Sequence, residues 1–284
     1  MNVHDNKLIK TLVFTAICAA NLLAALVHAA PKKTEEPYIF GVLPALSTNQ
    51  LIKSFAPVAN LLSTSLGRPV KIETAPDFKT FLSRIIDEKR YDIILPPPHF
   101  YLLTHSKASY EAIARADTEH MRAVIVVNQN SPLQSMKDLR GKKLSIIDSF
   151  ALVALLVKQQ LSQIPLHPGK DIELIETPTH DAALFAITNN TADAAAAIKV
   201  IYERSTVNFL QSTRIIAKSD PVQTSPIAVA PWILSDERER IQKTLVSPKN
   251  NYIFKHLKWS GMLRASTEDY RSLEWTLPLL ENER

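Results

Sequence analysis

Cysteine and glycine are both scarce in this sequence of 284 residues. The one cysteine, Cys18, lies in an apolar N-terminal segment, so the rest of the chain has no thiol. That excludes thiol catalysis, disulfides and zinc–thiolate sites after this segment, and it suits export to an oxidising compartment. The five glycines are spread along the chain, whereas phosphate-cradling nucleotide loops need several close together. Such nucleotide-binding folds are therefore disfavoured.

A strong charge of one sign is also missing. The formal net charge is +5, and it falls to +4 when residues 1–30 are left out. The basic residues are dispersed and form no run of the kind that binds nucleic acid. We therefore expect no nucleic-acid partner.

The N-terminus has the features of a cleavable secretory signal peptide. Lys7 and Lys10 precede an apolar run from about Leu12 to Val27, and small residues follow at Ala29 and Ala30. These features predict a signal peptide over residues 1–30 and a periplasmic mature protein that starts near Ala30 or Pro31. The alternative is an uncleaved anchor, although the run is short for a membrane span. A lipid anchor on Cys18 is disfavoured, because the preceding Ile17 is not small.

Strand and helix patterns alternate twice along the chain. The first series predicts strands at 38–43, 69–74 and 91–95 with helices at 47–66 and 77–88. The second series begins near Lys143 and alternates strands with helices at 150–164 and 179–189. This order predicts an α/β fold of two lobes, each a mostly parallel sheet flanked by helices. We expect residues 37–119 and 221–284 to form one lobe, 120–220 to form the other, and extended crossings to join them.

Several segments resemble the phosphate, phosphite and phosphonate periplasmic substrate-binding proteins of ABC transporters. The resemblance lies in the order and spacing of FGVLP, YDIILPPPHFYLL, SPLQSMKDLRGKKLSIID, THDAALFAITNNTADAAAAI, SDPVQTSPIAVAP and STEDYRSLEW. It spans nearly the whole chain after residue 30. It implies the two-lobed type 2 periplasmic-binding-protein clamshell, a small-molecule ligand held by lobe closure, a membrane permease as partner, and neither a cofactor nor enzymatic activity.

The sequence departs from this family where the ligand would bind. The family has Ser-Thr-Ser-Gly at the start of a helix in the second lobe, and this chain has Ala151, Leu152, Val153 and Ala154 there. Near Val200 and Ser225, where the family places carboxylates for an amino group, this chain has none. Each lost hydrogen bond to a charged group weakens oxyanion binding by about 1–3 kcal/mol. We therefore expect no tight capture of phosphate or phosphonate, and a weakly held oxyanion, a more apolar ligand or a protein partner stays open.

Eight residues are candidates for ligand contact: Phe78, His99, Tyr101, Ser149, Phe150, Ala151, His180 and Asp181. The resemblance aligns Phe78 with a pocket aromatic, and His99 and Tyr101 follow a buried strand at its carboxyl end, where α/β ligands bind. The alternatives are an ordinary core role for Phe78, turn packing for His99 and Tyr101, and helix capping around His180 and Asp181. No metal site is expected, because His99 and His105 are six residues apart and share no helix face.

Two functions remain open from the sequence. The first is a monomeric solute-binding protein of a phosphonate-type ABC transporter whose usual oxyanion site is lost. The second is a periplasmic ligand-sensing or interaction protein that signals to a membrane sensor. An enzyme on the same fold is disfavoured, since Ser149 lacks the Gly-x-Ser-x-Gly surroundings of a hydrolase nucleophile.

Overall fold

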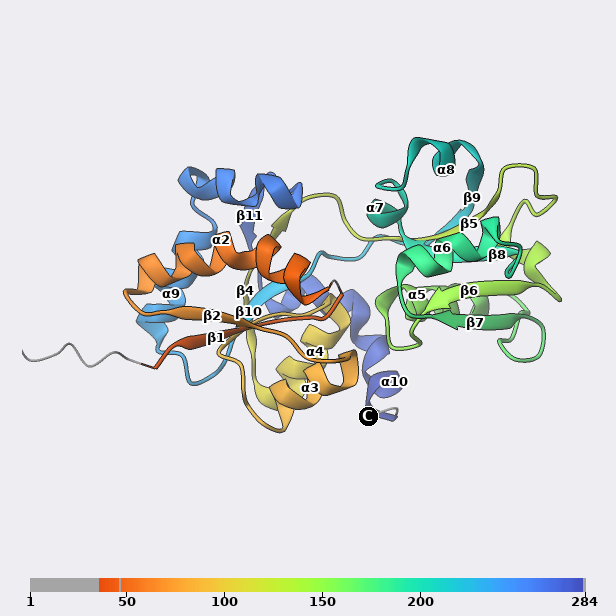
Figure 1. Ribbon diagram of the computed structural model, residues 1–284. Helices are drawn as coiled ribbons and strands as arrows, with labels where there is room; N and C mark the ends of the chain where they lie inside the picture. Colours follow the sequence, from red (N-terminus) through yellow and green to blue (C-terminus); the bar gives the residue numbers. More distant parts are fainter. Residues whose placement is uncertain (1–35, 46, 283–284) are drawn as a thin grey trace, which may run out of the picture. The chain divides into compact units, whose positions relative to one another are not determined.

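The chain folds around two separate β-sheets (Figure 1). The computed structural model describes residues 36–45 and 47–282, so the predicted signal peptide at 1–30 lies outside the described residues. Residues from Pro37 onward form one compact unit. We call the six-stranded sheet with its helices lobe 1 and the five-stranded sheet with its helices lobe 2. The predicted α/β class with two sheets flanked by helices is confirmed.

Lobe 1 is built from strands of both halves of the chain. In spatial order they are β11 (Gly261–Arg264), β4 (Glu111–Asp117), β10 (Pro226–Val229), β3 (Ile93–Leu95), β1 (Tyr38–Val42) and β2 (Val70–Glu73). The centre of the sheet is apolar on both faces, since Phe40, Ile93 and Ile94 are fully buried. This burial explains why β3 appears in the sequence as a continuous apolar run rather than as an alternating one.

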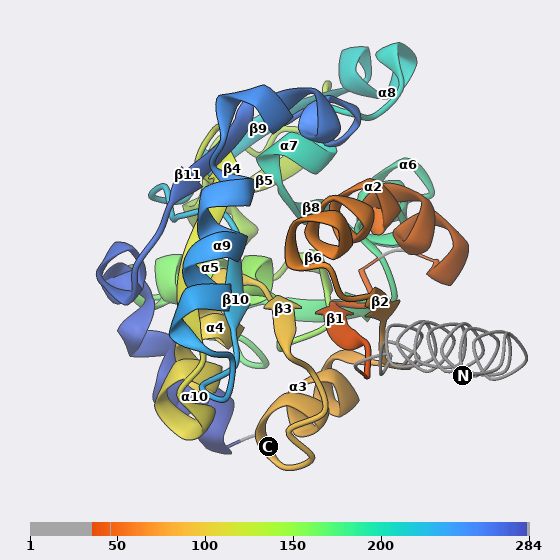
Figure 2. The ribbon, with the colours of Figure 1, turned by 90° about the vertical axis from the view of Figure 1, so that its left-hand side faces the viewer.

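Helices cover both faces of the lobe 1 sheet (Figures 1 and 2). α2 (Thr48–Leu66) packs against α9 (Ser235–Leu245) and the 3-10 segment η2 (Pro248–Leu257). On the other face, α3 (Phe78–Ile86) packs against α4 (Pro98–Ala108), which contacts the 3-10 segment η3 (Thr267–Thr276) and α10 (Leu277–Asn282). Asp77 fixes the start of α3, because its carboxylate accepts the N–H of Thr80 at 2.6 Å.

Lobe 2 is a smaller sheet with a core of small side chains. Its strands in spatial order are β7 (Glu173–Thr177), β6 (Lys143–Ile147), β8 (Ala194–Ile198), β5 (Ala123–Asn128) and β9 (Thr213–Lys218). The helical segments are η1 (Met136–Leu139), α5 (Leu152–Ser162), α6 (His180–Thr188), α7 (Lys199–Tyr202) and α8 (Val207–Gln211). The four alanines of β8 are fully buried, and both α5 and α6 lie against this strand.

The strand pairing differs from the predicted mostly parallel sheets. β1 pairs with β2 and β3 in parallel, whereas β10 pairs with β3 and β4, and β11 with β4, in antiparallel fashion. In lobe 2, β6 is parallel to β7 and β8, and β5 is antiparallel to β8 and β9. The antiparallel pairs involve the strands next to the two segments that connect the lobes, and strand β11. Each sheet is therefore mixed, because the chain leaves and re-enters lobe 1 in opposite directions.

Two extended segments connect the lobes. Residues 118–122 lead from β4 to β5, and residues 219–225 lead from β9 back to β10; we call them the crossing pair. Met121 and Val222 of the two segments exchange two backbone hydrogen bonds of 2.9 and 2.8 Å, and the Arg122 side chain donates to the Ser219 carbonyl at 3.1 Å. The Ser219 hydroxyl also accepts the N–H of Ala123 at 2.9 Å. The crossing pair is thus a short two-stranded ribbon with few backbone bonds.

One buried hydrophobic cluster includes residues of both sheets and of the crossing pair. Its members include Phe40 and Ile94 in lobe 1, Ile125 and Ala196 in lobe 2, and Val222 between them.

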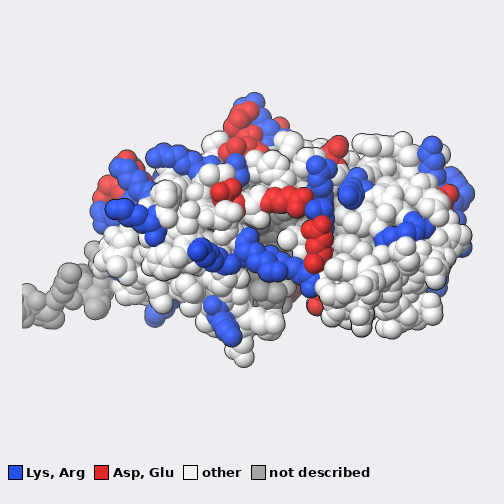
Figure 3. Space-filling model, turned by 90° about the horizontal axis from the view of Figure 1, so that it is seen from above, with Lys and Arg blue, Asp and Glu red and all other residues white. Residues whose placement is uncertain are grey.

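Charged side chains of both signs are interspersed on the face shown in Figure 3. Within the described residues, no helix has both the length and the hydropathy needed to cross a bilayer.

Candidate functional site

The turn between β6 and α5 places the predicted residues 149–151 at the start of a lobe 2 helix. Asp148 shapes this turn, since its side chain accepts the N–H of Phe150 and its carbonyl accepts the N–H of Ala151, both at 2.8 Å. Ala151 is the N-cap of α5 in an extended conformation. Its methyl group cannot accept a hydrogen bond from the first helical turn, in contrast to the serine that the family resemblance implies.

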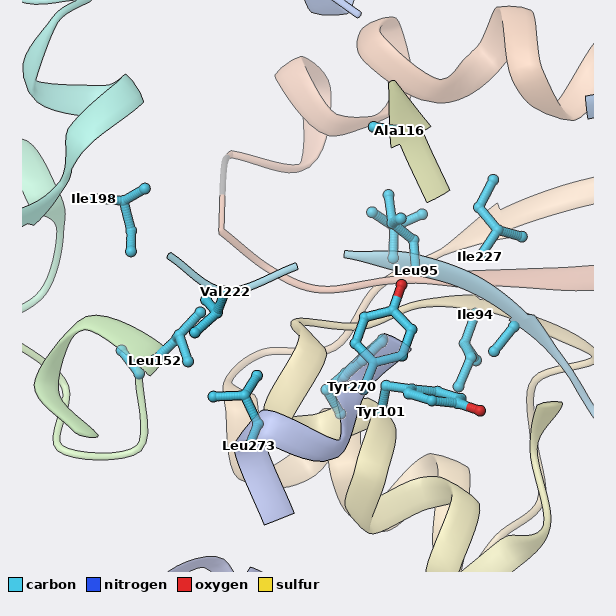
Figure 4. Close-up of a cluster of buried hydrophobic side chains, with 14 of the residues drawn as sticks. Ile94, Leu95, Tyr101, Ala116, Leu152, Ile198, Val222, Ile227, Tyr270 and Leu273 are labelled. Atoms are coloured by element: carbon cyan, nitrogen blue, oxygen red, sulfur yellow. The ribbon is translucent and has the colours of Figure 1, made fainter. Parts of the chain in front are cut away.

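The first turn of α5 is apolar and buried. The exposed fraction is 7% for Ala151, 4% for Leu152 and 1% for Val153. Leu152 belongs to the buried cluster that also holds Val222 of the crossing pair and Leu273 of lobe 1 (Figure 4). The backbone N–H groups of a helix start attract anions, but a hydroxyl-free and desolvated start gives an oxyanion few donors. The start of α5 therefore lies among apolar side chains of the protein.

His99 connects this helix start to lobe 1. Its Nε2 lies 2.9 Å from the backbone carbonyl oxygen of Phe150, and its ring is fully buried. A carbonyl oxygen only accepts, so Nε2 carries the proton and Nδ1 is a bare acceptor. Within the described part of the chain, Nδ1 has no hydrogen-bond partner. Desolvation lowers the pKa of His99 to about 4, so the ring is neutral at neutral pH.

Phe78 lies beside the residues that contact α5. It is the first residue of α3, it is half-buried, and its ring meets Phe100 edge-to-face with centroids 6.1 Å apart. Phe100 belongs to a group of buried side chains from both lobes that we call the interlobe cluster: Leu82, Phe100 and Leu103 of lobe 1, Leu280 of α10, and Leu155 of α5. Phe78 and Phe150 pack at its edge. The structure thus brings together Phe78, His99, Phe150 and the start of α5.

Tyr101 lies in the core of lobe 1 instead. Its ring is fully buried and packs against Tyr270 with centroids 5.0 Å apart. Its hydroxyl lies 2.6 Å from Thr267 Oγ1 and accepts the N–H of Ala112 at 3.0 Å. These partners use the polar end of the side chain within lobe 1, which favours the packing role that the sequence left open.

His180 and Asp181 begin α6. Thr179 is the N-cap and accepts the N–H of Ala182 at 3.1 Å, as the capping alternative predicted. Asp181 is exposed in the first turn, where a carboxylate favours the helix dipole. Burial lowers the pKa of His180 to about 4, and its Nδ1 has no partner among the described residues. Ligand contact by this pair stays a prediction.

Sequence reasoning missed the apolar partners of α5 in lobe 1. Leu155 and Leu280 belong to the same interlobe cluster, although 125 positions separate them in the chain. The only sequence feature that the two residues share is that each is an apolar residue in a helix. A cavity of about 560 Å³ lies beside this cluster, at Lys79, Ser83, Asp87, Leu103, Lys107 and Glu281. None of the eight predicted site residues lines it.

Metal binding receives no support from the geometry. Within residues 36–45 and 47–282, no group of three or more His, Cys, Asp or Glu side chains is arranged to hold a metal ion. The candidate residues bring together backbone N–H groups at one helix start, a buried neutral imidazole, and apolar side chains.

The architecture is shared with solved two-lobed binding proteins. A binding protein component of an ABC phosphonate transporter from Pseudomonas aeruginosa superposes with a TM-score of 0.73, at 16% identity over 87% of each chain. PhnD1 from Prochlorococcus marinus, solved with methylphosphonate, gives a TM-score of 0.74 at 16% identity over 86% of this chain and 98% of that one. A protein from Xanthomonas citri, solved with chloride, gives 0.74 at 15% identity over 87% of this chain and 99% of that chain.

A family comparison agrees with these structures. The model of the family described as "ABC transporter, phosphonate, periplasmic substrate-binding protein" matches residues 40–270, which include nearly all strands of both sheets. The resemblance inferred from the sequence motifs is thereby confirmed. The chain belongs to the phosphonate ABC transporter family of periplasmic substrate-binding proteins.

Proposed function

We propose that this chain captures a small, weakly polar organic solute in the periplasm and delivers it to a membrane permease. Its family consists of periplasmic solute-binding proteins that bind small ligands and interact with such permeases. The observation that carries the ligand class is the buried apolar start of α5, where Ala151, Leu152 and Val153 replace the hydroxyls that the family resemblance implies. The family membership does not favour the sensor alternative.

The proposed mechanism needs no bond chemistry. The solute lies between the helix starts of the two lobes, and closure about the crossing pair removes it from water. Phe78, Phe150 and the first turn of α5 supply apolar contact, and His99 and His180 supply neutral ring nitrogens. A bare imidazole nitrogen accepts a hydrogen bond, so it suits a ligand hydroxyl or amide and repels an oxyanion.

The proposal also covers the cleavage and the oligomeric state of the exported protein. We expect a monomer that starts near Ala30 or Pro31 after removal of residues 1–30. Intact mass spectrometry of the exported protein measures the cleavage site, and light scattering measures the oligomeric state. A mass that includes residues 1–30 would contradict cleavage.

A thermal-shift screen tests the ligand class. The panel holds phosphate, phosphite, methylphosphonate and 2-aminoethylphosphonate against small aromatic and aliphatic carboxylic acids, amides and alcohols. A ligand at about 100 times its Kd adds about 2.7 kcal/mol, which for a chain of this size raises Tm by roughly 5–10 °C. We expect such shifts only among the weakly polar organic compounds. Sub-micromolar binding of a phosphorus oxyanion would overturn the proposed ligand class.

The triple variant Ala151→Ser, Leu152→Thr, Val153→Ser tests whether the start of α5 lines the ligand site. It restores the hydroxyl pattern implied by the family resemblance at the start of α5, so methylphosphonate affinity should rise. Calorimetric titration measures the change, after circular dichroism has shown that the variant folds. If the folded variant gains no oxyanion affinity, the start of α5 does not line the ligand site.

A further inference from the structure

The start of α5 contacts lobe 1 in two chemically different ways. The first contact is the hydrogen bond from His99 Nε2 to the carbonyl of Phe150. The second is the interlobe cluster, in which Leu155 of α5 lies with Leu82, Phe100, Leu103 and Leu280. Each of these five side chains is at most 4% exposed. The surface that would face an anion in this family therefore faces apolar side chains of the opposite lobe.

Both contacts involve buried side chains of lobe 1, so opening them has a cost. His99 is fully buried, so separating it from Phe150 leaves a desolvated imidazole N–H and a carbonyl to be rehydrated together. Separating Leu155 from the four lobe 1 side chains exposes apolar surface on both sides. Another hydrogen bond between the lobes, from Arg204 to the Leu257 carbonyl, is exposed and 3.5 Å long. Such a long and exposed bond contributes little to holding the lobes together.

The last helix of the chain takes part in this contact. α10 (Leu277–Asn282) contributes Leu280 to the interlobe cluster and packs on α4. The ion pair between Lys107 of α4 and Glu281 of α10, at 2.6 Å, holds the helix against lobe 1. Lobe 1 therefore offers α5 a surface assembled from α3, α4 and the C-terminal helix.

We propose that His99, Phe150 and the interlobe cluster form a latch that holds the two lobes together without a solute. The crossing pair is joined only by one backbone bridge and by the hydrogen bond from the Arg122 side chain to the Ser219 carbonyl, so it leaves rotation of the lobes possible once the contact at α5 breaks. The latch sets the equilibrium between separated and joined lobes in the free protein. A solute then binds a pre-joined state, or it must first break the latch. This inference goes beyond the proposed transport role and does not depend on the identity of the ligand.

Distance measurements between the lobes test the latch. The chain after residue 30 has no cysteine, so Lys53→Cys on α2 and Gln163→Cys at the end of α5 give two unique sites for spin labels. Both side chains are exposed. The exported protein is stripped of solute by unfolding and refolding, and native mass spectrometry verifies that it is empty. Pulsed electron–electron double resonance then measures the distribution of distances between the two labels, and small-angle scattering measures the radius of gyration.

The comparison uses Phe150→Ala as the first variant, because Phe150 is half-buried at the edge of the cluster and its truncation spares both sheets. Leu280→Ala on the terminal helix is a second, independent variant. The matched control is Phe185→Ala, since Phe185 is 54% exposed on α6 and its ring meets Phe209 within lobe 2. Circular dichroism establishes that each variant is folded.

We expect one narrow distance distribution for the empty wild type and the Phe185→Ala control. Phe150→Ala and Leu280→Ala should each lower the ratio of joined to separated lobes by about tenfold, with a longer, broader distribution and a larger radius of gyration. A broad, long distribution in the empty wild type would overturn the latch, and so would latch variants that match the control. These measurements involve no solute, so a failed ligand screen leaves their outcome unaffected.

Discussion

His99 is a fully buried histidine that donates its Nε2 proton to a backbone carbonyl of the other lobe. Desolvation lowers its pKa from 6.5 to about 4, which corresponds to about 3 kcal/mol of linkage between folding and pH. In the unfolded chain the ring takes up a proton below pH 6.5, whereas in the folded chain it does so only near pH 4. The contribution of His99 to stability is therefore complete above pH 6.5 and lost as the pH falls toward 4.

This linkage predicts how His99→Gln changes acid sensitivity. Glutamine can donate to the Phe150 carbonyl but does not titrate, so the variant should lack the contribution from His99. Between pH 7.5 and pH 5 we expect the free energy of unfolding of the wild type to fall by about 2 kcal/mol more than that of the variant. Urea unfolding at a series of pH values measures this difference. Equal pH dependence in both proteins would show that His99 is not neutral and buried as described.

α5 is a helix that begins without a side-chain cap, and its apolar first turn is fixed by packing instead. Ala151 already has the extended N-cap conformation, with φ −66° and ψ 144°. Ala151→Ser would place an acceptor next to the N–H groups of Val153 and Ala154. We expect the free energy of unfolding to rise by about 1 kcal/mol, as measured by urea denaturation.

Ala154→Ser is the matched control for this cap. Ala154 is fully buried inside the same helix, so a hydroxyl there is desolvated without reaching the free end of the helix. Stability should fall in this control. Equal effects at the two positions would mean that the start of α5 gains nothing from a cap and that packing alone sets where the helix begins.

The helices also show which features of the fold sequence patterns predict and which they do not. The periodicity predicted a helix over 77–88, and α3 runs from Phe78 to Ile86, because the Asp77 cap and the helical spacing are local signals. The sequence also located the start of α5 and the loss of its hydroxyls. The presence of Leu155 and Leu280 in one cluster could not be predicted in this way, because apolar spacing shows which face of a helix is buried but not what buries it.

For the molecule as a whole, the order of motifs predicted the two-sheet fold, and the crossing pair explains why each sheet is mixed. A parallel series predicts strands that all run one way within a lobe. Met121 and Val222, however, lie on segments that run in opposite directions between the lobes. Their neighbours β4, β5, β9 and β10 inherit these directions, and the resulting antiparallel pairs follow from long-range topology rather than from any local pattern.

The buried cluster that includes both sheets and the crossing pair predicts cooperative unfolding of the two lobes. Multidomain chains often melt in steps, but lobes that share a core lose their contacts together. We expect one calorimetric transition for the empty protein, with the calorimetric and van't Hoff enthalpies equal at roughly 170 kcal/mol for a folded region of this size. Two resolved transitions would show that the shared cluster does not couple the lobes.

A substitution confined to lobe 2 makes this test sharper. Leu184 is 2% exposed and belongs to a cluster made only of lobe 2 residues, so Leu184→Ala should cost about 2–5 kcal/mol there. If the lobes unfold together, the whole transition moves down by roughly 5–15 °C, and the fluorescence of Trp232, Trp259 and Trp275, which all lie in lobe 1, changes at the same lowered temperature. If this fluorescence keeps its wild-type melting temperature while lobe 2 melts early, the lobes unfold independently.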